Sequence, residues 1–179
     1  NREMNMSGHS GASVTEPIRY PSVITIDNHR ACNARCRMCP TQNIPLALGL
    51  MSDAVFDALV TQLADFAEKI KFAQFGVHGE PLLDKNLEAR IAKVVGIGIS
   101  RVWVATNGAA MTQRRAERFI AANTEAIIFS VDGITKETYE KIRIGLEYER
   151  VVNNVLNFIR LRDLRGGRTR VVLRFISQG

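Results

Sequence analysis

The sequence predicts an α/β fold in which parallel strands alternate with helices. Short runs rich in β-branched residues, which favour strands, alternate with longer segments whose apolar residues recur at helical spacing. In addition, polar or glycine-rich residues follow four successive predicted strands, as expected where strand ends meet at one ligand-binding edge. This pattern is compatible with both an open sheet and a barrel.

Five strands are predicted from short runs of apolar residues. The first contains Val23, Ile24 and Ile26 and leads directly into a cysteine-rich loop. The fourth is almost entirely apolar, which is typical of a strand that is covered on both faces. The predicted strands span residues 23–26, 71–77, 101–105, 125–131 and 171–176.

The predicted helices lie between these strands. Ser52 is a suitable N-cap for a helix whose apolar positions extend to Phe66. Asp84 is expected to cap a second helix that Gly96 ends, and Thr112 is expected to open a third. A short helix over residues 136–142 and a longer one around 151–159 follow, before a turn at Gly166 and Gly167.

Length and composition predict one domain with a hydrophobic core. The chain has 179 residues, of which 46% are apolar and 23% charged. We expect residues 1–16 to be a disordered leader and residues 17–179 to form the domain. No apolar run is long enough to span a membrane. The net charge is +6, but the basic residues are scattered, so nucleic-acid binding is not favoured.

All three cysteines lie within eight residues, as Cys32, Cys36 and Cys39. An odd number of cysteines cannot form a complete set of disulfides, so this cluster indicates a metal site in a reducing compartment, and we expect a cytoplasmic protein. Three thiolates are one fewer than the four that usually hold an iron–sulfur cluster, which would leave one iron for another ligand. The alternative is a structural Cys₃His zinc site that includes His29.

Motifs after the later strands extend this pattern. His78-Gly79-Glu80-Pro81 follows the second strand, Thr106-Asn107-Gly108 lies at the end of the third, and Ser130-Val131-Asp132-Gly133 at the end of the fourth. Together with the CxxxCxxC loop, in this order, they resemble the radical S-adenosylmethionine (radical SAM) superfamily, where the second motif reads Gly-Gly-Glu-Pro. Residues 79–83, 106–108 and 131–143 resemble its SPASM/twitch branch, and the whole resemblance covers residues 22–177.

The resemblance implies a fold, cofactors and an activity. The fold would be a partial (β/α) barrel that is truncated after strand five, without its C-terminal part or any auxiliary-cluster domain. The cofactors would be a [4Fe–4S] cluster and S-adenosylmethionine (SAM), whose reductive cleavage gives a 5′-deoxyadenosyl radical. That radical would abstract a hydrogen atom from a peptide, sugar or aminocyclitol, making the protein an oxidoreductase or a related enzyme. A flavodoxin- or ferredoxin-type partner would supply the electron.

The resemblance also implies roles for individual residues. Cys32, Cys36 and Cys39 would bind the cluster. Glu80 would accept a hydrogen bond from the amino group of SAM, with Gly79 allowing close backbone approach. Contacts to SAM are implied for Met38, Gly79, Glu80, Asn107, Ser130, Asp132 and Arg143.

Several alternatives stay open at this point. Asn107, Ser130 and Asp132 also fit ordinary turns, and His78 is expected to fill space beside the second strand. The protein could instead be a zinc-stabilised αβ binding module, or a radical SAM activase or methylthiolating enzyme acting on protein or RNA. No residue is identified as a catalytic acid or base.

Overall fold

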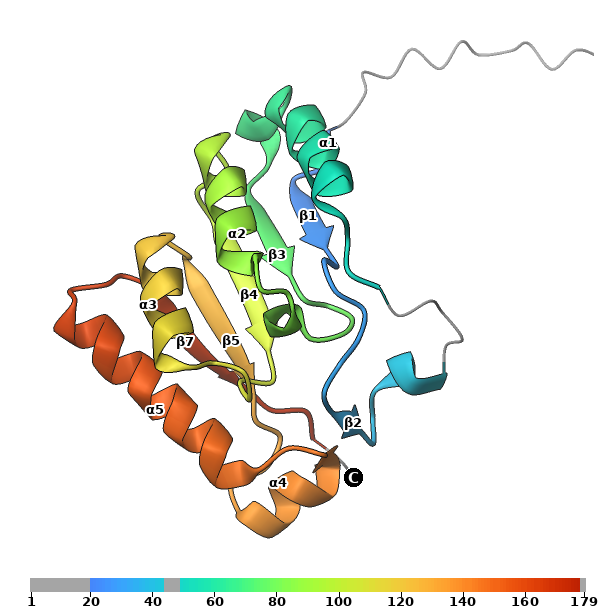
Figure 1. Ribbon diagram of the computed structural model, residues 1–179, viewed down its shortest axis with the longest axis vertical. Coiled ribbons are helices and arrows are strands. Elements are labelled where there is room, and N and C mark those ends of the chain that lie inside the picture. Colours follow the sequence, from blue (N-terminus) through green and yellow to red (C-terminus); the bar gives the residue numbers. More distant parts are fainter. Residues whose placement is uncertain (1–19, 44–48, 178–179) are drawn as a thin grey trace, which may run out of the picture.

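Five parallel strands form one sheet in the computed structural model, which describes residues 20–43 and 49–177 (Figure 1). The strand order is β1-β3-β4-β5-β7, and β2 and β6 form a separate antiparallel pair. The strands are β1 (Val23–Ile26), β2 (Arg35–Cys36), β3 (Phe72–Phe75), β4 (Val102–Thr106), β5 (Ala126–Ser130), β6 (Arg143–Ile144) and β7 (Arg170–Arg174). The helices are α1 (Asp53–Ala64), α2 (Leu87–Gly96), α3 (Gln113–Ala121), α4 (Lys136–Ile142) and α5 (Tyr148–Leu164), with short 3₁₀ helices η1 (Pro40–Asn43), η2 (Ala67–Lys69) and η3 (Pro81–Leu83).

The five predicted strands are confirmed, with ends that differ from the prediction by at most two residues. All four pairings in the main sheet are parallel. The β2–β6 pair was not predicted, because strands of two residues carry no hydrophobic periodicity. The predicted disordered leader lies outside the described residues.

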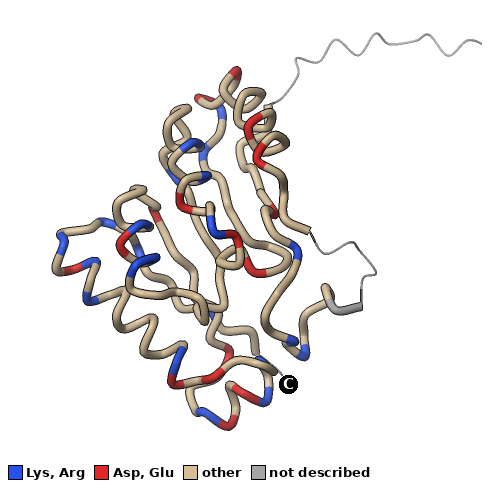
Figure 2. Tube along the Cα trace, in the orientation of Figure 1, with Lys and Arg blue, Asp and Glu red and all other residues tan. Residues whose placement is uncertain are grey.

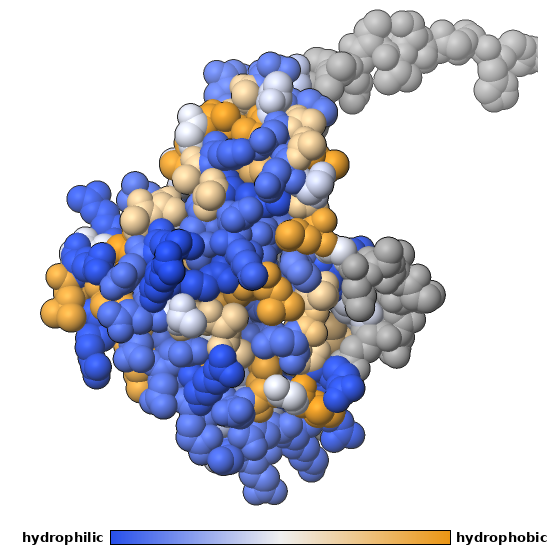
Figure 3. All heavy atoms as spheres, viewed as in Figure 1, coloured by the Kyte–Doolittle hydropathy of each residue, from blue (hydrophilic) through white to orange (hydrophobic). Residues whose placement is uncertain are grey.

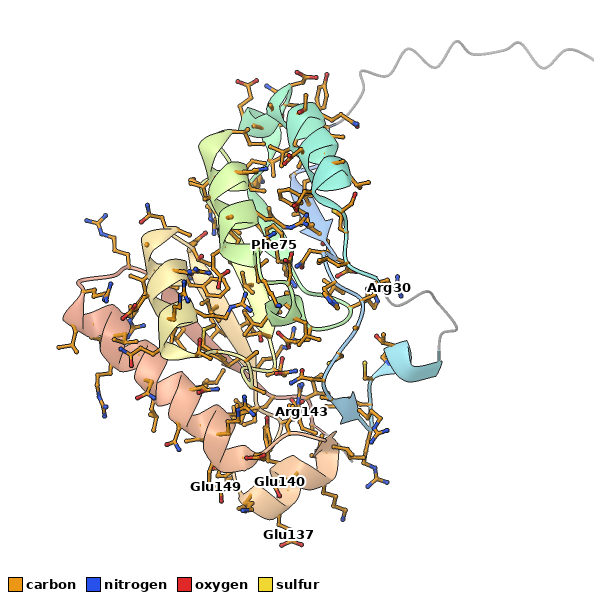
Figure 4. All side chains as sticks on the ribbon, viewed as in Figure 1. Arg30, Phe75, Glu137, Glu140, Arg143 and Glu149 are labelled. Atoms are coloured by element: carbon orange, nitrogen blue, oxygen red, sulfur yellow. The ribbon has the colours of Figure 1, made fainter. Side chains whose placement is uncertain are left out.

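One face of the sheet packs against the helices and forms the hydrophobic core. Phe75, Val104 and Phe129 are fully buried on this face, and α1, α2, α3 and α5 lie along it (Figure 1). Phe129 meets Phe158 of α5 edge to face, with ring centroids 5.9 Å apart. Figure 4 shows Phe75 inside this layer. Burial of these rings fixes the strands, and hence the loops at their ends.

The opposite face of the sheet changes character along the strands. Near the amino ends, Phe72 stacks on Trp103 with centroids 5.0 Å apart, and the Arg170 guanidinium lies 5.4 Å from the Trp103 ring centroid. At the carboxyl ends the register places Ser130 beside Arg174 on this same face. The face is therefore aromatic at one end and polar at the end where the conspicuous sequence motifs lie.

The cap predicted for the second helix is wrong. Helix α2 begins at Leu87, and the residue at its N-cap is Asn86. The Asp84 carboxylate is instead buried, where it accepts a hydrogen bond from Asn28 Nδ2 at 2.9 Å and pairs with Arg90 Nε at 3.0 Å. Asp84 therefore joins the loop after β1 to α2, a long-range role that local capping patterns do not reveal.

The other predicted caps are confirmed. Ser52 Oγ accepts a hydrogen bond from Val55 N at 3.2 Å at the start of α1, and Thr112 caps α3 in the same way. Helix α1 ends at Ala64, so Phe66 is not part of it as predicted. The Phe66 ring instead stacks on Tyr20, with centroids 5.1 Å apart.

The surface is mixed in charge and hydropathy. Figure 2 shows Lys and Arg interspersed with Asp and Glu along most of the helices, in agreement with the scattered basic residues of the sequence. Figure 3 shows hydrophobic atoms as small patches within a hydrophilic surface on the face in view. Within the described ranges, no helix has both the length and the apolar character needed to cross a membrane.

Candidate functional site

A cavity of about 350 Å³ lies at the carboxyl ends of the parallel strands, within the size range of small-molecule sites. Its wall contains residues from the loops after β1, β3 and β4 and from the ends of β5 and β7. The predicted site residues found in this wall are Cys32, Cys36, Met38, Cys39, Gly79, Glu80, Asn107, Ser130 and Arg143. Asp132 is the one predicted residue that does not line it.

The cysteine loop is held in place by the short antiparallel pair. In β2 and β6, Cys36 is the register partner of Arg143. The amide of Arg37 donates to the carbonyl of Ile142 at 3.0 Å, and the amide of Cys39 donates to the carbonyl of Cys36 at the same distance. These backbone bonds fix the loop relative to the end of α4, so the three thiols face one cavity.

Two of the thiols, those of Cys32 and Cys36, lie where desolvation disfavours the thiolate form. Desolvation raises the pKa of Cys32, and the charges of Glu80 and the other two cysteines add to that rise. Desolvation also raises the pKa of Cys36, although the Arg143 guanidinium, whose Nη1 lies 3.6 Å from Cys36 Sγ, opposes it. Iron binding displaces the thiol protons and neutralises this charge, so the donor set fits a metal cluster.

The single-zinc alternative requires His29 as the fourth ligand beside the three cysteines. Within residues 20–43 and 49–177, no group of three His, Cys, Asp or Glu side chains is arranged to hold one metal ion. His29 is absent from the cavity wall, and its Nδ1 accepts a hydrogen bond from Ala31 N at 3.1 Å. An iron–sulfur cubane needs wider spacing than one zinc ion, because each thiolate binds a different iron.

Glu80 is buried, with 1% of its surface exposed, and its carboxylate accepts three hydrogen bonds. Oε1 accepts hydrogen bonds from Leu82 N at 2.9 Å and Thr106 Oγ1 at 2.6 Å, and Oε2 accepts one from Asn107 N at 2.8 Å. Burial raises the pKa of Glu80, while these hydrogen bonds act against the rise. Glu80 thus joins the loop after β3 to the end of β4 within the cavity wall.

Gly79 occupies a backbone position that only glycine fits. Its φ is +71°, and a Cβ at this residue would lie 2.1 Å from the carbonyl oxygen of His29. The neighbouring Glu80 amide donates to the Ala31 carbonyl at 2.8 Å. The loop after β3 is thereby pressed against the segment that leads into Cys32.

Replacement of Gly79 by alanine should lower the free energy of unfolding by more than about 2 kcal/mol, because the new Cβ meets backbone and the φ is strained. The matched control is Gly98→Ala, since Gly98 has φ +100° but no atom within 4 Å of an added Cβ. Gly98→Ala should lower the free energy of unfolding by only about 1 kcal/mol, because it adds backbone strain but no steric clash. If urea unfolding showed the same loss of stability for Gly79→Ala and Gly98→Ala, the result would contradict a close backbone contact at Gly79.

Asn107 connects the β4 end to the cysteine loop. Its Nδ2 donates to Asn33 Oδ1 at 2.8 Å and lies 3.9 Å from Cys32 Sγ. Its Oδ1 accepts a hydrogen bond from Ala109 N at 2.9 Å, which is the turn chemistry expected of an Asn-Gly sequence. Asn107 therefore both stabilises the turn after β4 and lines the cavity.

Asp132 and Arg143 form a buried ion pair beside the cavity. The Arg143 guanidinium donates two hydrogen bonds to Asp132 Oδ2, through Nε at 2.8 Å and through Nη2. Asp132 Oδ1 accepts a hydrogen bond from Ile176 N at 2.8 Å. Arg143 lines the cavity, whereas Asp132 lies outside the cavity wall and holds the Arg143 guanidinium in place. Figure 4 labels Arg143, which follows the end of α4.

Ser130 bonds to an arginine that sequence reasoning did not single out. Arg174 Nη2 donates to Ser130 Oγ at 2.8 Å, and both residues line the cavity. Arg174 is one of several arginines in the strand and turn after α5, so neither spacing nor motif distinguished it. Only the β5–β7 register reveals its position.

His78 is held by an aspartate that the sequence analysis also missed. Asp27 Oδ1 accepts hydrogen bonds from the amides of Val77 and His78, at 3.0 and 2.9 Å, and Oδ2 lies 2.8 Å from His78 Nδ1. Partial burial by itself raises the pKa of Asp27, but these hydrogen bonds outweigh it and hold the pKa below 3.8. His78 is absent from the cavity wall.

Replacement of Asp27 by asparagine should lower the free energy of unfolding by about 1 kcal/mol at pH 7, because the amides lose a charged acceptor. A carboxyl group whose pKa is lowered by folding stabilises the folded state when the pH is above its ordinary pKa of 3.8. This stabilisation is lost as the pH falls below 3.8 and through the lowered pKa. The difference between wild type and variant should therefore shrink below pH 3.8 in urea unfolding. A constant difference would contradict the charge effect.

Comparison with known proteins identifies the chain's relatives. A family model described as "Radical SAM superfamily" matches residues 29–165. Molybdenum cofactor biosynthesis protein 1 of Dictyostelium discoideum is 25% identical over 152 residues, which are 82% of this chain and 23% of that protein. GTP 3′,8-cyclase of Xanthomonas campestris pv. campestris is 33% identical over 119 residues, or 64% of this chain and 35% of the enzyme. The chain thus spans less than half of either relative.

Solved structures share the fold. BtrN in complex with AdoMet and 2-DOIA superposes with a TM-score of 0.63 at 20% identity, over 87% of this chain and 58% of BtrN. AnSMEcpe with bound AdoMet gives a TM-score of 0.65 at 18% identity, over 84% of this chain and 42% of that one. At these identities the likeness establishes the arrangement of strands and helices, which agrees with the predicted partial barrel.

Proposed function

The chain belongs to the radical SAM superfamily, and from that premise we propose that its cysteine loop holds a [4Fe–4S] cluster to which SAM binds. The observation that carries the proposal is the convergence of Cys32, Cys36 and Cys39 on one cavity at the strand ends. When bound, the cluster supplies one electron for the reductive cleavage of SAM, which yields a 5′-deoxyadenosyl radical for hydrogen abstraction.

The chain's own residues hold and orient these groups. The β2–β6 pair fixes the thiols, and the Arg143 guanidinium lies against Cys36, where it stabilises the thiolate form. Glu80 holds the ends of β3 and β4 together through three hydrogen bonds. Because both of its carboxylate oxygens already accept hydrogen bonds, we propose that Glu80 shapes the SAM site and adds negative charge there, in addition to a contact with the amino group of SAM. Met38, partly buried against the core, supplies an apolar wall.

Substrate and branch are further parts of the proposal. The motifs at residues 79–83, 106–108 and 131–143 support the SPASM/twitch branch, and with it a peptide, sugar or aminocyclitol substrate. The relatives named GTP 3′,8-cyclase favour a nucleotide as a second candidate. In either case we propose a flavodoxin- or ferredoxin-type electron donor and a cytoplasmic location.

The test is anaerobic reconstitution of the full chain with iron and sulfide, followed by reduction with dithionite in the presence of SAM. We expect about four irons per chain and the formation of methionine and 5′-deoxyadenosine. A protein that takes up one zinc ion and no iron would overturn the proposal. Uptake of iron without SAM cleavage under these conditions would overturn its catalytic part.

A further inference from the structure

Arg174 lies at the carboxyl end of β7 in a position that the sheet fixes. Its register partner in β5 is Ser130, and its carbonyl accepts a hydrogen bond from Val131 N at 2.9 Å. Two residues later, Ile176 N donates to Asp132 Oδ1 at 2.8 Å. Backbone pairing on both sides therefore aims the Arg174 side chain at the cavity, where its Nη2 donates to Ser130 Oγ.

The Arg174 guanidinium has unused hydrogen-bonding capacity. Its one side-chain partner in the described part of the chain is the neutral hydroxyl of Ser130, and it has no carboxylate within ion-pair distance there. A guanidinium carries five N–H donors in a planar fork that matches carboxylate and phosphate groups. Arg174 is also exposed, so an incoming anion reaches it without first displacing buried protein groups.

The cavity wall contains more arginine than aspartate and glutamate residues. It contains Arg30, Arg35, Arg143 and Arg174, whereas Glu80 is the only aspartate or glutamate in it among the described residues. Arg143 is neutralised by Asp132, but no acidic partner is found within the described ranges for the other three arginines. Figure 4 shows Arg30 on the connection between β1 and β2, and β1 and β7 are the two outer strands of the main sheet.

The cofactors of the proposed function do not account for this surplus. A four-iron cluster held by three thiolates carries net negative charge, and SAM carries net positive charge, so the two largely offset each other. Arg143, rather than Arg174, is the arginine that contacts a cluster cysteine. The guanidinium groups of Arg30, Arg35 and Arg174 therefore remain available to an anionic group other than these cofactors.

We propose that the substrate carries an anionic group, a phosphate or a carboxylate, that pairs with Arg174 beside Ser130. This inference rests on the proposed function and makes Arg174 a specificity-determining residue. It favours a phosphorylated or acidic substrate over a neutral sugar or an aminocyclitol, whose amino groups the arginine-rich wall would repel.

The test uses the full chain, reconstituted with its cluster and saturated with SAM at low salt, where charge pairing is least screened. Inorganic pyrophosphate and acetate are titrated separately by calorimetry, so that the two arms distinguish phosphate from carboxylate. We expect one of them to bind, and Arg174→Gln to weaken that binding about tenfold or more. The anion affinity of Arg174→Lys should lie between those of wild type and Arg174→Gln, because lysine keeps the positive charge but lacks the planar set of guanidinium donors.

The matched control is Arg160→Gln, which removes one positive charge from an exposed position on α5 outside the cavity wall. It should leave anion affinity unchanged. Failure of both anions to bind wild type, or equal affinity in wild type and Arg174→Gln, would overturn the inference. So would loss of SAM binding in Arg174→Gln, which would assign this arginine to the cofactor. Failure of the proposed function would be seen earlier, as absence of the cluster before any anion is added.

Discussion

Replacement of Cys36 by serine is expected to abolish the iron–sulfur cluster and, with it, SAM cleavage. Cys36 is the buried member of the three proposed ligands and is held by both the β2–β6 pair and the Arg143 guanidinium. Serine binds iron more weakly than a thiolate does, and the site has no fourth cysteine to substitute for it. Iron content and 5′-deoxyadenosine formation should each fall by more than about 100-fold, since even loss of an outer-shell partner costs 10–100-fold.

The control for this prediction is Met38→Leu, within the same loop. Met38 is partly buried against the core and lines the cavity, and leucine conserves its volume without adding or removing a metal ligand. This variant should bind iron as wild type does. Retention of iron by Cys36→Ser, or its equal loss from Met38→Leu, would contradict the assignment of the cluster ligands.

Replacement of Asp132 by asparagine is expected to lower the free energy of unfolding by about 3–5 kcal/mol, because it leaves the Arg143 guanidinium buried without its counter-charge. The Asp132 side chain is 1% exposed and that of Arg143 is 10% exposed. Asparagine also tolerates the φ of 56° at this position, so backbone strain does not enter the comparison. The change is measured by urea unfolding at pH 7.

An exposed ion pair provides the matched control. Asp163 pairs with Arg162 Nη2 at 2.8 Å, and 62% of the Asp163 side chain is exposed. Asp163→Asn should therefore cost no more than about 1 kcal/mol, because water screens the pair. A loss at Asp132 as small as that at Asp163 would mean that the buried pair does not support the cavity wall.

The five strands of the main sheet could be predicted from the sequence, because each one is a distinct apolar run followed by turn residues. The carboxyl ends of such strands meet at one edge, so the order of strands and motifs in the sequence is enough to assign these motifs to a common site. The cavity wall contains Glu80 and eight other predicted residues, and the Glu80 carboxylate also accepts hydrogen bonds from within the protein, which the sequence did not predict.

What the sequence did not reveal depends on pairings between distant residues. Asp84 looked like a helix cap, yet it binds Asn28 and Arg90 across the fold. Likewise, Arg174 has no motif of its own and acquires its place only when β7 aligns with β5. Interactions over such sequence separations leave no periodic or local signal, so pattern reasoning has no means of finding them.

The most direct test of the central claim is electron paramagnetic resonance of the anaerobically reconstituted, reduced protein with and without SAM. We expect a [4Fe–4S]⁺ signal whose shape changes on addition of SAM, because in the proposed site the cofactor binds the iron that Cys32, Cys36 and Cys39 leave open. A cluster signal that SAM does not alter would contradict an open iron in this cavity. Absence of any cluster signal would contradict the assignment of the three cysteines as its ligands.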